Sequence, residues 1–297
     1  MLGKLSKLIK EIFLIIKADK INAHYLNIPA KDNRVNIYEY HPELLGYNLS
    51  NKLPYNLGDS LGKVIIKYLL EQRSLNLDCW VSKRKHINCV GSNILCSYQN
   101  TTIWGSGVQN YPSTHKILLQ KISRRKLDIR AVRGPLSKQI IEKLGHKCPD
   151  IYGDPAILMP FIYNPIIEKK YKYSIIPQFV VEDIFRKEYP NEHIISMNTD
   201  DYEMVINEIK ASDIIYSSSL HGIILAEAYG VPAVFFRGLD KCVDFKYLDY
   251  YYSTGRKNIE IAESFEEAMK MTPLPLPDLS KLQKGLLDSF PYDLWMS

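Results

Sequence analysis

The sequence predicts an α/β protein made of two tandem domains, each with a mainly parallel sheet covered by helices. Short apolar segments typical of strands alternate with segments of helical periodicity. A polar, charged stretch at residues 164–172 divides this alternation into two series. The chain has 297 residues, of which 46% are apolar and 24% charged, so it is long enough to form two packed cores.

The first series contains strands followed by Gly- or Asn-rich turns. The strands are expected at residues 36–40, 88–94, 101–104 and 128–132. A helix follows the Gly/Asn-rich loop of residues 54–62, and another runs from the last strand to Gly145, which can adopt the left-handed conformation of a helix C-cap. This order predicts parallel strands joined by helical crossovers.

The second series repeats the same alternation. Its strands are expected at residues 173–176, 193–197, 213–217 and 232–236, and its helices at residues 180–188, 202–210 and 221–229. We therefore expect an N-terminal helix at residues 1–30, a Rossmann-like domain at residues 31–165, and a second Rossmann-like domain with C-terminal helices at residues 166–297. Two such domains with a central cleft resemble the GT-B architecture of many glycosyltransferases.

Residues 1–20 have the pattern of a basic amphipathic helix. Apolar residues recur at steps of three and four from Leu2 to Ile16, and lysines lie largely between them. Such a helix can lie in a membrane interface or pack on the body of the protein, and both alternatives stay open. No secretory signal is recognised and no apolar run reaches about 18 residues, so we expect a cytoplasmic protein, with peripheral contact at the inner face of the cell membrane as an open alternative.

Charge and cysteine content exclude several classes of function. The net charge of +5 is spread along the chain, which disfavours a nucleic-acid binder. The cysteines are scattered and odd in number, which predicts free thiols and neither a zinc site nor a disulfide framework. They are Cys79, Cys89, Cys96, Cys148 and Cys242. No cluster of Asp or His residues appears, so we expect no required metal.

The strongest motif is SSSLHGIILAEAYGVPAVFF at residues 217–236. A strand leads into a helix at His221 and Gly222, the kind of strand end where open α/β sheets bind ligands, and helix N-termini attract anions. Gly222 allows a ligand to approach the backbone, and His221 could donate a proton near neutral pH. A lone histidine here could equally be a capping or core residue. The candidate binding residues of this turn are Ser217, Ser219, Leu220 and Gly222.

Four more motifs precede this one. They are NLGDSL at residues 56–61, IWGSGV at 103–108, VRGPLS at 132–137 and GDPAILMP at 153–160. Together with S-x-x-H-G around His221, and in this order, they resemble the polysaccharide pyruvyl transferase family. Each motif is weak alone, but five in order are fairly specific, and the similarity extends over roughly residues 35–257.

The resemblance implies a transferase with phosphoenolpyruvate as donor substrate and no other cofactor. The acceptor would be a sugar or lipid-linked oligosaccharide of a capsule or exopolysaccharide, and the product a cyclic pyruvate ketal on a hexose. The resemblance also implies that Arg133 and His221 face the donor. The chemistry agrees, because the planar fork of an arginine matches a phosphate or a carboxylate. The alternative for Arg133 is a surface arginine that pairs with an acidic neighbour.

Further candidates lie on the other motifs. Asp59 could orient or deprotonate a sugar hydroxyl on the acceptor side, or it could simply cap a helix. Asn56 lies on the same loop, and Ser106 and Gly107 could contact either substrate. Asp154, in a Gly-Asp-Pro sequence, could belong to the site or only form a turn.

Two other functions compete with this interpretation. A glycosyltransferase using a nucleotide sugar would explain the helix that carries Glu227, but it leaves NLGDSL and VRGPLS without a role. A non-enzymatic scaffold or sugar-binding protein would not need Arg133 and His221, which are both present.

Overall fold

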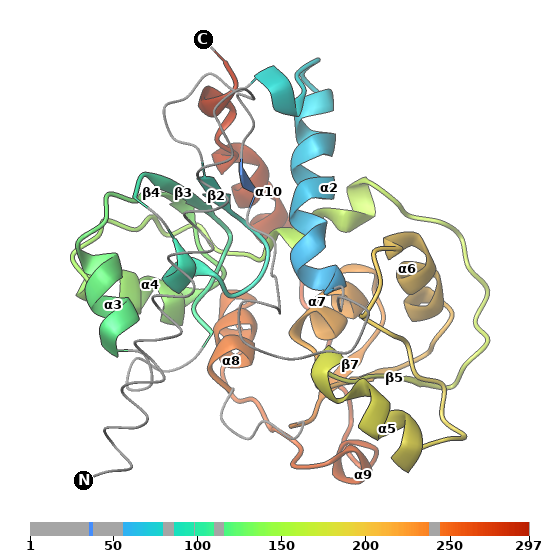
Figure 1. Ribbon diagram of the computed structural model, residues 1–297. Coiled ribbons are helices and arrows are strands. Elements are labelled where there is room, and N and C mark those ends of the chain that lie inside the picture. The colour runs from blue at the N-terminus through green and yellow to red at the C-terminus, as the bar shows by residue number, and fades with distance from the viewer. Residues whose placement is uncertain are drawn as a thin grey trace, which may run out of the picture.

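A computed structural model describes residues 36–37, 56–79, 86–97, 99–109, 116–237 and 244–296. It shows a mixed α/β protein with two parallel sheets (Figure 1). The first sheet has the order β1 (Asn36–Ile37), β2 (His86–Asn88), β3 (Thr101–Trp104), β4 (Asp128–Ala131). The second has the order β5 (Ser174–Ile176), β6 (Ile215–Ser217), β7 (Ala233–Phe235). The predicted α/β class is confirmed, whereas the two-domain arrangement with a central cleft stays a prediction.

Helices surround both sheets. The α-helices are α2 (Leu57–Glu71), α3 (Lys116–Ser123), α4 (Pro135–Lys143), α5 (Glu182–Glu188), α6 (Tyr202–Lys210), α7 (Leu220–Ala228), α8 (Asp244–Ser253), α9 (Phe265–Ala268) and α10 (Ser280–Ser289). The 3₁₀ helices are η2 (Leu77–Cys79), η3 (Ile94–Cys96), η5 (Pro155–Phe161), η6 (Phe179–Val181) and η7 (Tyr292–Leu294). The predicted N-terminal helix lies outside the described residues. Within them, no helix is long and apolar enough to span a membrane.

Local signals explain where several helices begin and end. Helix α4 starts at Pro135, whose ring presets the backbone for the first helical position. It is followed by Gly145 with a φ of 88°, the left-handed conformation expected after a helix. Asp201 caps α6 by accepting a hydrogen bond from the Met204 N–H at 2.9 Å. The bounds predicted for α6 are therefore confirmed.

The predicted strand at residues 88–94 is wrong for most of its length. Strand β2 ends at Asn88, and Gly91 then adopts a φ of 94°, which breaks the extended conformation. The chain turns there and forms η3. The turn brings Gly91 and Ser92 to the carboxyl end of the first sheet, where the candidate site lies.

The predicted strand at residues 193–197 is also wrong, because this segment forms one bridge and then leaves the sheet. Ile175 donates to the His193 carbonyl and Ile195 donates to the Ile175 carbonyl, both at 2.9 Å. Two residues later, the Met197 carbonyl accepts from Leu57 N–H at 3.0 Å instead. The start of α2, on the first series, therefore takes the hydrogen bond that a longer strand would have used.

The C-terminal part of the chain returns to the first sheet. Trp104 of β3 donates its indole N–H to the Leu286 carbonyl of α10 at 3.0 Å, and the Trp104 and Phe290 rings pack nearly perpendicular with their centroids 4.9 Å apart. Figure 1 shows α10 beside α2, and Tyr292 of η7 donates to the Leu69 carbonyl at 3.1 Å. Helix α10, which we expected in the second domain, thus packs with the first sheet, whereas Phe265 of α9 packs with the second sheet.

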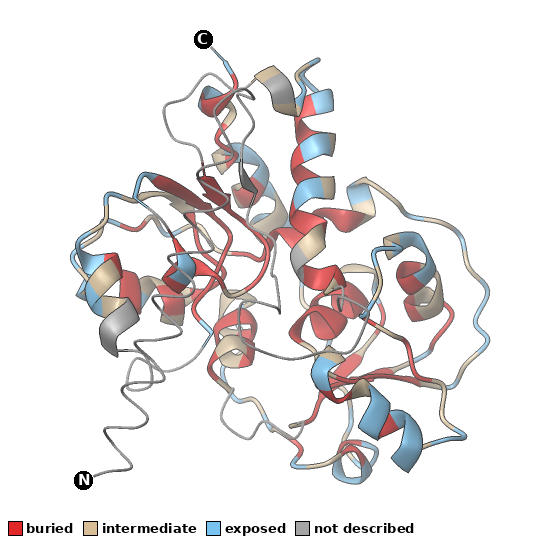
Figure 2. Ribbon diagram, viewed as in Figure 1, coloured by how far each residue is buried: buried red, intermediate tan, exposed pale blue. Residues whose placement is uncertain are grey.

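One buried apolar cluster includes residues from both sheets. Trp104 of β3 and Ile176 of β5 both belong to it, together with residues of α2, η5 and α7 (Figure 2). Helix α7 is buried over nearly its whole length, from Leu220 to Glu227. The two sheets are therefore joined through packed side chains of α2, η5 and α7, which fix the relative positions of the motifs.

The packing of α10 can be tested with two adjacent leucines. Leu286 is fully buried against the turn at Gly153, whereas Leu287 is 36% exposed. We expect Leu286→Ala to lower the free energy of unfolding by about 2–5 kcal/mol, and Leu287→Ala to lower it by less than about 1 kcal/mol. Urea denaturation of both variants measures the difference. Equal losses would contradict the packing of α10 against the first sheet.

Candidate functional site

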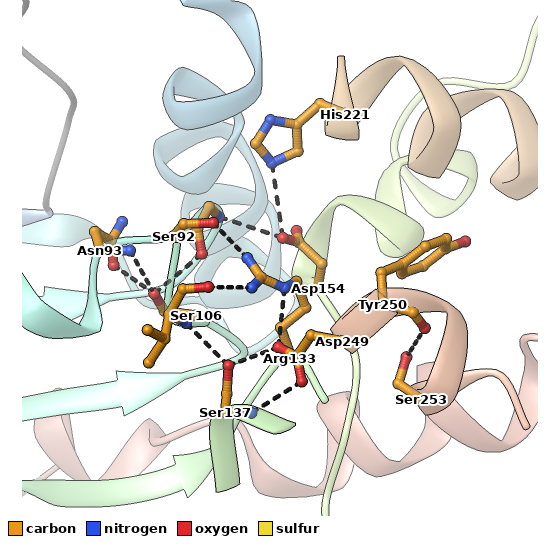
Figure 3. A network of polar contacts seen from close by, with 12 residues as sticks. Ser92, Asn93, Ser106, Arg133, Ser137, Asp154, His221, Asp249, Tyr250 and Ser253 are labelled. Carbon is orange, nitrogen blue, oxygen red and sulfur yellow. Dashed lines mark hydrogen bonds and ion pairs between the residues drawn. The ribbon is translucent and has the colours of Figure 1, made fainter. Parts of the chain in front are cut away.

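The loops that follow strands of the first sheet meet the start of α7, the helix that follows β6 of the second sheet (Figure 3). Ser92 follows β2, Ser106 follows β3, Arg133 follows β4, and His221 follows β6. Parallel sheets bind their ligands at this edge of the strands. The five sequence motifs, spread over residues 56–222, contribute to the same region through the contacts described below.

His221 is the central residue of this region. It lies in the first turn of α7 and is 7% exposed. Its Nε2 atom is buried without a hydrogen-bond partner and lies 3.6 Å from Oδ2 of Asp154. A buried polar atom without a partner is costly and uncommon in folded proteins. The position of His221 as a candidate site residue is therefore supported by its geometry as well as by its motif.

Gly58, in the first turn of α2, provides the space that the His221 ring occupies. A Cβ atom built on Gly58 would lie 1.7 Å from Nδ1 and 2.3 Å from Cγ of His221. No side chain can share that volume, so the glycine of NLGDSL and the histidine of S-x-x-H-G are steric partners. Both residues belong to predicted motifs, but no local pattern predicts that they touch.

Asp154 is fully buried and held at both carboxylate oxygens. Oδ1 accepts from the Ala156 N–H at 3.1 Å, which caps the start of η5, and Oδ2 accepts from the Gly91 N–H at 3.3 Å. The open question of a turn or a site residue is thus answered in part. Asp154 does cap η5, and its carboxylate also faces His221.

Arg133 is fully buried, so the surface position in the alternative is wrong, although the arginine does pair with an acidic residue, Asp249. Its Nε donates to Oδ2 of Asp249 at 3.2 Å, and its two terminal nitrogens donate to Ser92 Oγ at 2.5 Å and the Val108 carbonyl at 2.6 Å. Gly107 lies directly over it, because a Cβ there would be 2.3 Å from the guanidinium carbon. In this structure the arginine fork binds protein groups, and contact with a donor substrate stays a prediction.

Asp249 of α8 completes the arginine network and was not identified from the sequence. Besides Arg133, it accepts from the backbone N–H and the hydroxyl of Ser137, at 2.9 and 2.6 Å. Its carboxylate therefore accepts a backbone N–H that has no partner inside the first turn of α4, although the two residues are 112 positions apart in the chain. No local pattern marks such a residue, since DFKYLDYYY reads as an ordinary helix.

Ser106 and Asn93 bond to each other inside the first sheet's loops. Ser106 Oγ is fully buried, donates to Asn93 Oδ1 at 2.5 Å, and accepts from the Asn93 N–H at 3.2 Å. This hydroxyl is engaged in holding two loops together. A direct contact of Ser106 or Gly107 with a substrate stays a prediction.

The residues that precede α7 also bond within the protein. Ser217 Oγ donates to the Ile176 carbonyl at 2.8 Å and accepts from the Ser219 N–H at 3.0 Å. Gly222 packs against it, since a Cβ there would lie 2.4 Å from Ser217 Oγ. Leu220 is buried and Ser219 is half-buried at the N-cap of α7. These residues shape the turn that presents His221, and ligand contact by any of them stays a prediction.

The NLGDSL residues, predicted to form a loop on the acceptor side, instead form the start of α2, and their place near an acceptor stays a prediction. Asn56 is the N-cap residue, and Asp59 follows inside the first turn, so Asp59 is not the cap. The side chain of Asp59 lies outside what the structure describes, and its role with a sugar hydroxyl stays a prediction.

Glu227, at the end of α7, is bound by neighbouring side chains. Arg256 donates to its two oxygens at 2.6 and 2.7 Å, and the Tyr250 hydroxyl donates at 2.7 Å. Burial raises the pKa of Tyr250 well above its usual value, so this phenol stays protonated as a donor. Glu227 is therefore engaged in a buried network that fastens α8 to α7.

Across the described part of the chain, no group of three or more His, Cys, Asp or Glu side chains is arranged to hold a metal ion. The site is instead a set of polar groups from six segments, gathered where the two sheets meet. The groups available for chemistry are the His221 imidazole with its unpartnered nitrogen, the fixed Asp154 carboxylate and the Arg133 guanidinium.

Comparison with known proteins agrees with the motif pattern. A family model described as polysaccharide pyruvyl transferase matches residues 56–238, more than half of the chain, which confirms the resemblance. An uncharacterized protein of Acanthamoeba polyphaga mimivirus is 26% identical over 191 residues, covering 61% of this chain and 64% of that protein. The crystal structure of a functionally uncharacterized protein from Klebsiella pneumoniae aligns with 15% identity and a TM-score of 0.44, over 70% of this chain and 89% of that chain.

The contact between Gly58 and His221 makes a direct prediction. Gly58→Ala should displace the ring by more than about 1 Å, because its Cβ would lie 1.7 Å from Nδ1, and should lower His221-dependent activity roughly 100-fold, although alanine is the better helix former. The matched control is Gly285→Ala in α10, where the nearest atom to a new Cβ is 3.4 Å away. The control should keep full activity. Normal activity in Gly58→Ala would show that the ring can move without consequence.

Proposed function

The chain belongs to the polysaccharide pyruvyl transferase family, and we propose that it transfers the pyruvyl group of phosphoenolpyruvate to a hexose of a surface or exopolysaccharide repeat unit. The observation that carries the proposal is the buried ring of His221, whose Nε2 faces Asp154 without a hydrogen-bond partner, at the point where the family's motifs meet. The chain spans less than two thirds of the mimivirus relative, and the donor, the acceptor and the ketal product are proposals.

The proposed reaction requires proton transfer in both directions. The methylene carbon of phosphoenolpyruvate gains a proton and becomes a methyl group, and C2 develops oxocarbenium character. One sugar hydroxyl adds to C2, the C–O bond to phosphate breaks, and the second hydroxyl closes the ketal ring. Of the two hydroxyl hydrogens, one replaces the proton given to the methyl group and the other leaves with phosphate. A single histidine can therefore serve as acid and then as base.

His221 has the position that this chemistry needs. It stands in the first turn of α7, where backbone N–H groups and the helix dipole favour an anion such as the donor's phosphate. The ring is largely shielded from water, which strengthens interactions with a bound charge. We assign His221 as the general acid on these grounds. Arg133 is the candidate for binding the donor phosphoenolpyruvate, and Asp59 is the candidate for contacting the acceptor sugar.

The structure gives less support to a nucleotide-sugar glycosyltransferase. That alternative relies on the helix with Glu227 to bind the nucleotide sugar. The Glu227 carboxylate instead accepts hydrogen bonds from Arg256 and Tyr250. The alternative also leaves Gly58 and Asp154 without a role beside His221. Tight binding of uridine or guanosine diphosphate to the purified protein would favour it nevertheless.

Replacing His221 tests the general acid. His221→Gln keeps a polar side chain of similar length, so binding of phosphoenolpyruvate should persist while turnover falls about 10²- to 10⁴-fold. His221→Ala should lose turnover as well and leave a cavity. Phosphate release in the presence of candidate lipid-linked sugars measures turnover, and calorimetry measures donor binding. Near-normal turnover in His221→Gln would show that the proton comes from another group.

Arg133→Lys tests whether the arginine binds the donor or only supports the loops. A lysine is a point charge and cannot reproduce the three directional bonds of the guanidinium. If Arg133 binds the donor, KM for phosphoenolpyruvate should rise at least about tenfold. Asp249→Asn is the control, since it disturbs the same buried pair without removing the fork.

The two variants are compared in stability as well as in kinetics. Thermal unfolding should show both destabilised, because each perturbs a fully buried ion pair. Donor binding by Arg133 predicts a rise in KM for Arg133→Lys alone. Equal kinetic changes in the two variants would restrict Arg133 to a supporting role.

A further inference from the structure

Asp154 is the one carboxylate that faces His221 among the ion pairs of the described residues. We propose that Asp154 is a positioning residue, which holds the hydrogen of the His221 ring on Nε2 and leaves Nδ1 as the nitrogen that exchanges the catalytic proton. The catalytic part of this inference rests on the proposed function. The choice of ring nitrogen is a property of the free protein and can be measured without any substrate.

The carboxylate is placed by the backbone and has little freedom to move. It is fully buried, and each oxygen accepts from a backbone N–H, one from Ala156 in η5 and one from Gly91 after β2. Two segments of the first series therefore fix its direction. A carboxylate oxygen can accept more than one hydrogen bond, so Oδ2 can receive a hydrogen from His221 in addition to that from Gly91.

The ring of His221 is located from two sides. Nε2 points toward Oδ2 of Asp154 (Figure 3). On the other side, the ring at Nδ1 packs against Gly58 and occupies the volume that a Cβ atom would fill. Because Nε2 has no other partner, Asp154 is the group available to accept its hydrogen. The distance of 3.6 Å is just beyond a hydrogen bond, and such contacts in substrate-free sites commonly shorten when the substrate binds.

The chemistry of the two groups sets the tautomer. An ionised carboxylate only accepts hydrogen bonds, so it favours the neutral ring that carries its hydrogen on Nε2. Nδ1 is then the free lone pair, and a second proton taken up by the ring resides there. In the proposed reaction that proton goes to the methylene carbon, and a hydroxyl proton later replaces it. Nε2 keeps its hydrogen throughout.

The first experiment reads the tautomer directly. In the full chain labelled with ¹⁵N, long-range proton–nitrogen spectra of histidine rings distinguish a hydrogen on Nε2 from one on Nδ1. The His221 signals are identified by their loss in His221→Gln. We expect the neutral ring of the natural protein to carry its hydrogen on Nε2. We expect a mixture of both forms in Asp154→Asn, because an amide can donate as well as accept.

The second experiment asks whether Asp154 acts through His221. Asparagine can still cap η5, so Asp154→Asn should fold, and thermal unfolding checks this. Turnover in phosphate release should fall roughly 100-fold, with KM for phosphoenolpyruvate unchanged. In the His221→Gln background the same change should cost less than about twofold, since the residue it acts through is already gone.

Asp128→Asn provides a matched control. Asp128 is a partly buried aspartate on β4 that pairs with Arg130, away from His221. This variant should leave the His221 tautomer and the turnover as they are. The control shows whether an effect of Asp154→Asn is specific to Asp154 or follows from removing any buried aspartate charge.

The outcomes distinguish the inference from the proposed function. An unchanged His221 tautomer in Asp154→Asn, or an equal loss of turnover with and without His221, would overturn the positioning role. Absence of phosphate release in the natural protein with every acceptor would count against the proposed reaction only. The tautomer measurement would then still decide whether Asp154 directs the histidine.

Discussion

The fully buried ion pair between Arg133 and Asp249 constrains the rest of this structure. Removing one charge would leave the other uncompensated in the interior, at a cost of about 3–5 kcal/mol. The remaining donors and acceptors must also be satisfied, and the loops after β2 and β3 and the start of α4 supply the partners. The pair therefore dictates where these loops lie, although it contributes little net stability by itself.

Helix α8 transmits this constraint to the second sheet. Asp249 faces the first series, whereas Tyr247 donates to the Ser218 carbonyl and Tyr250 to Glu227. One helix thus fixes α4 and α7 relative to each other. This matters for the site because Asp154 belongs to the first series and His221 to α7, so a shift between them would separate the carboxylate from the imidazole.

The glycines of the motifs allow segments that are distant in sequence to approach each other closely. Gly58 makes room for the His221 ring and Gly107 for the Arg133 guanidinium. In both cases a charged or titratable side chain occupies the volume of the absent Cβ. The site is therefore assembled by shape as much as by hydrogen bonds, and its polar groups are held inside the protein with little exposure to water.

The sequence alone determined the α/β class, most strands, the helices with clear caps, and His221 as the main candidate, because these follow from local periodicity and turn chemistry. Only the tertiary structure decided that residues 193–197 leave the sheet, since Met197 bonds to the start of α2. It also decided that Arg133 is buried on Asp249, and that Asp154 and Gly58 enclose His221. These partners are 67 to 163 residues apart in the chain. No local pattern records which distant group will fill a buried space.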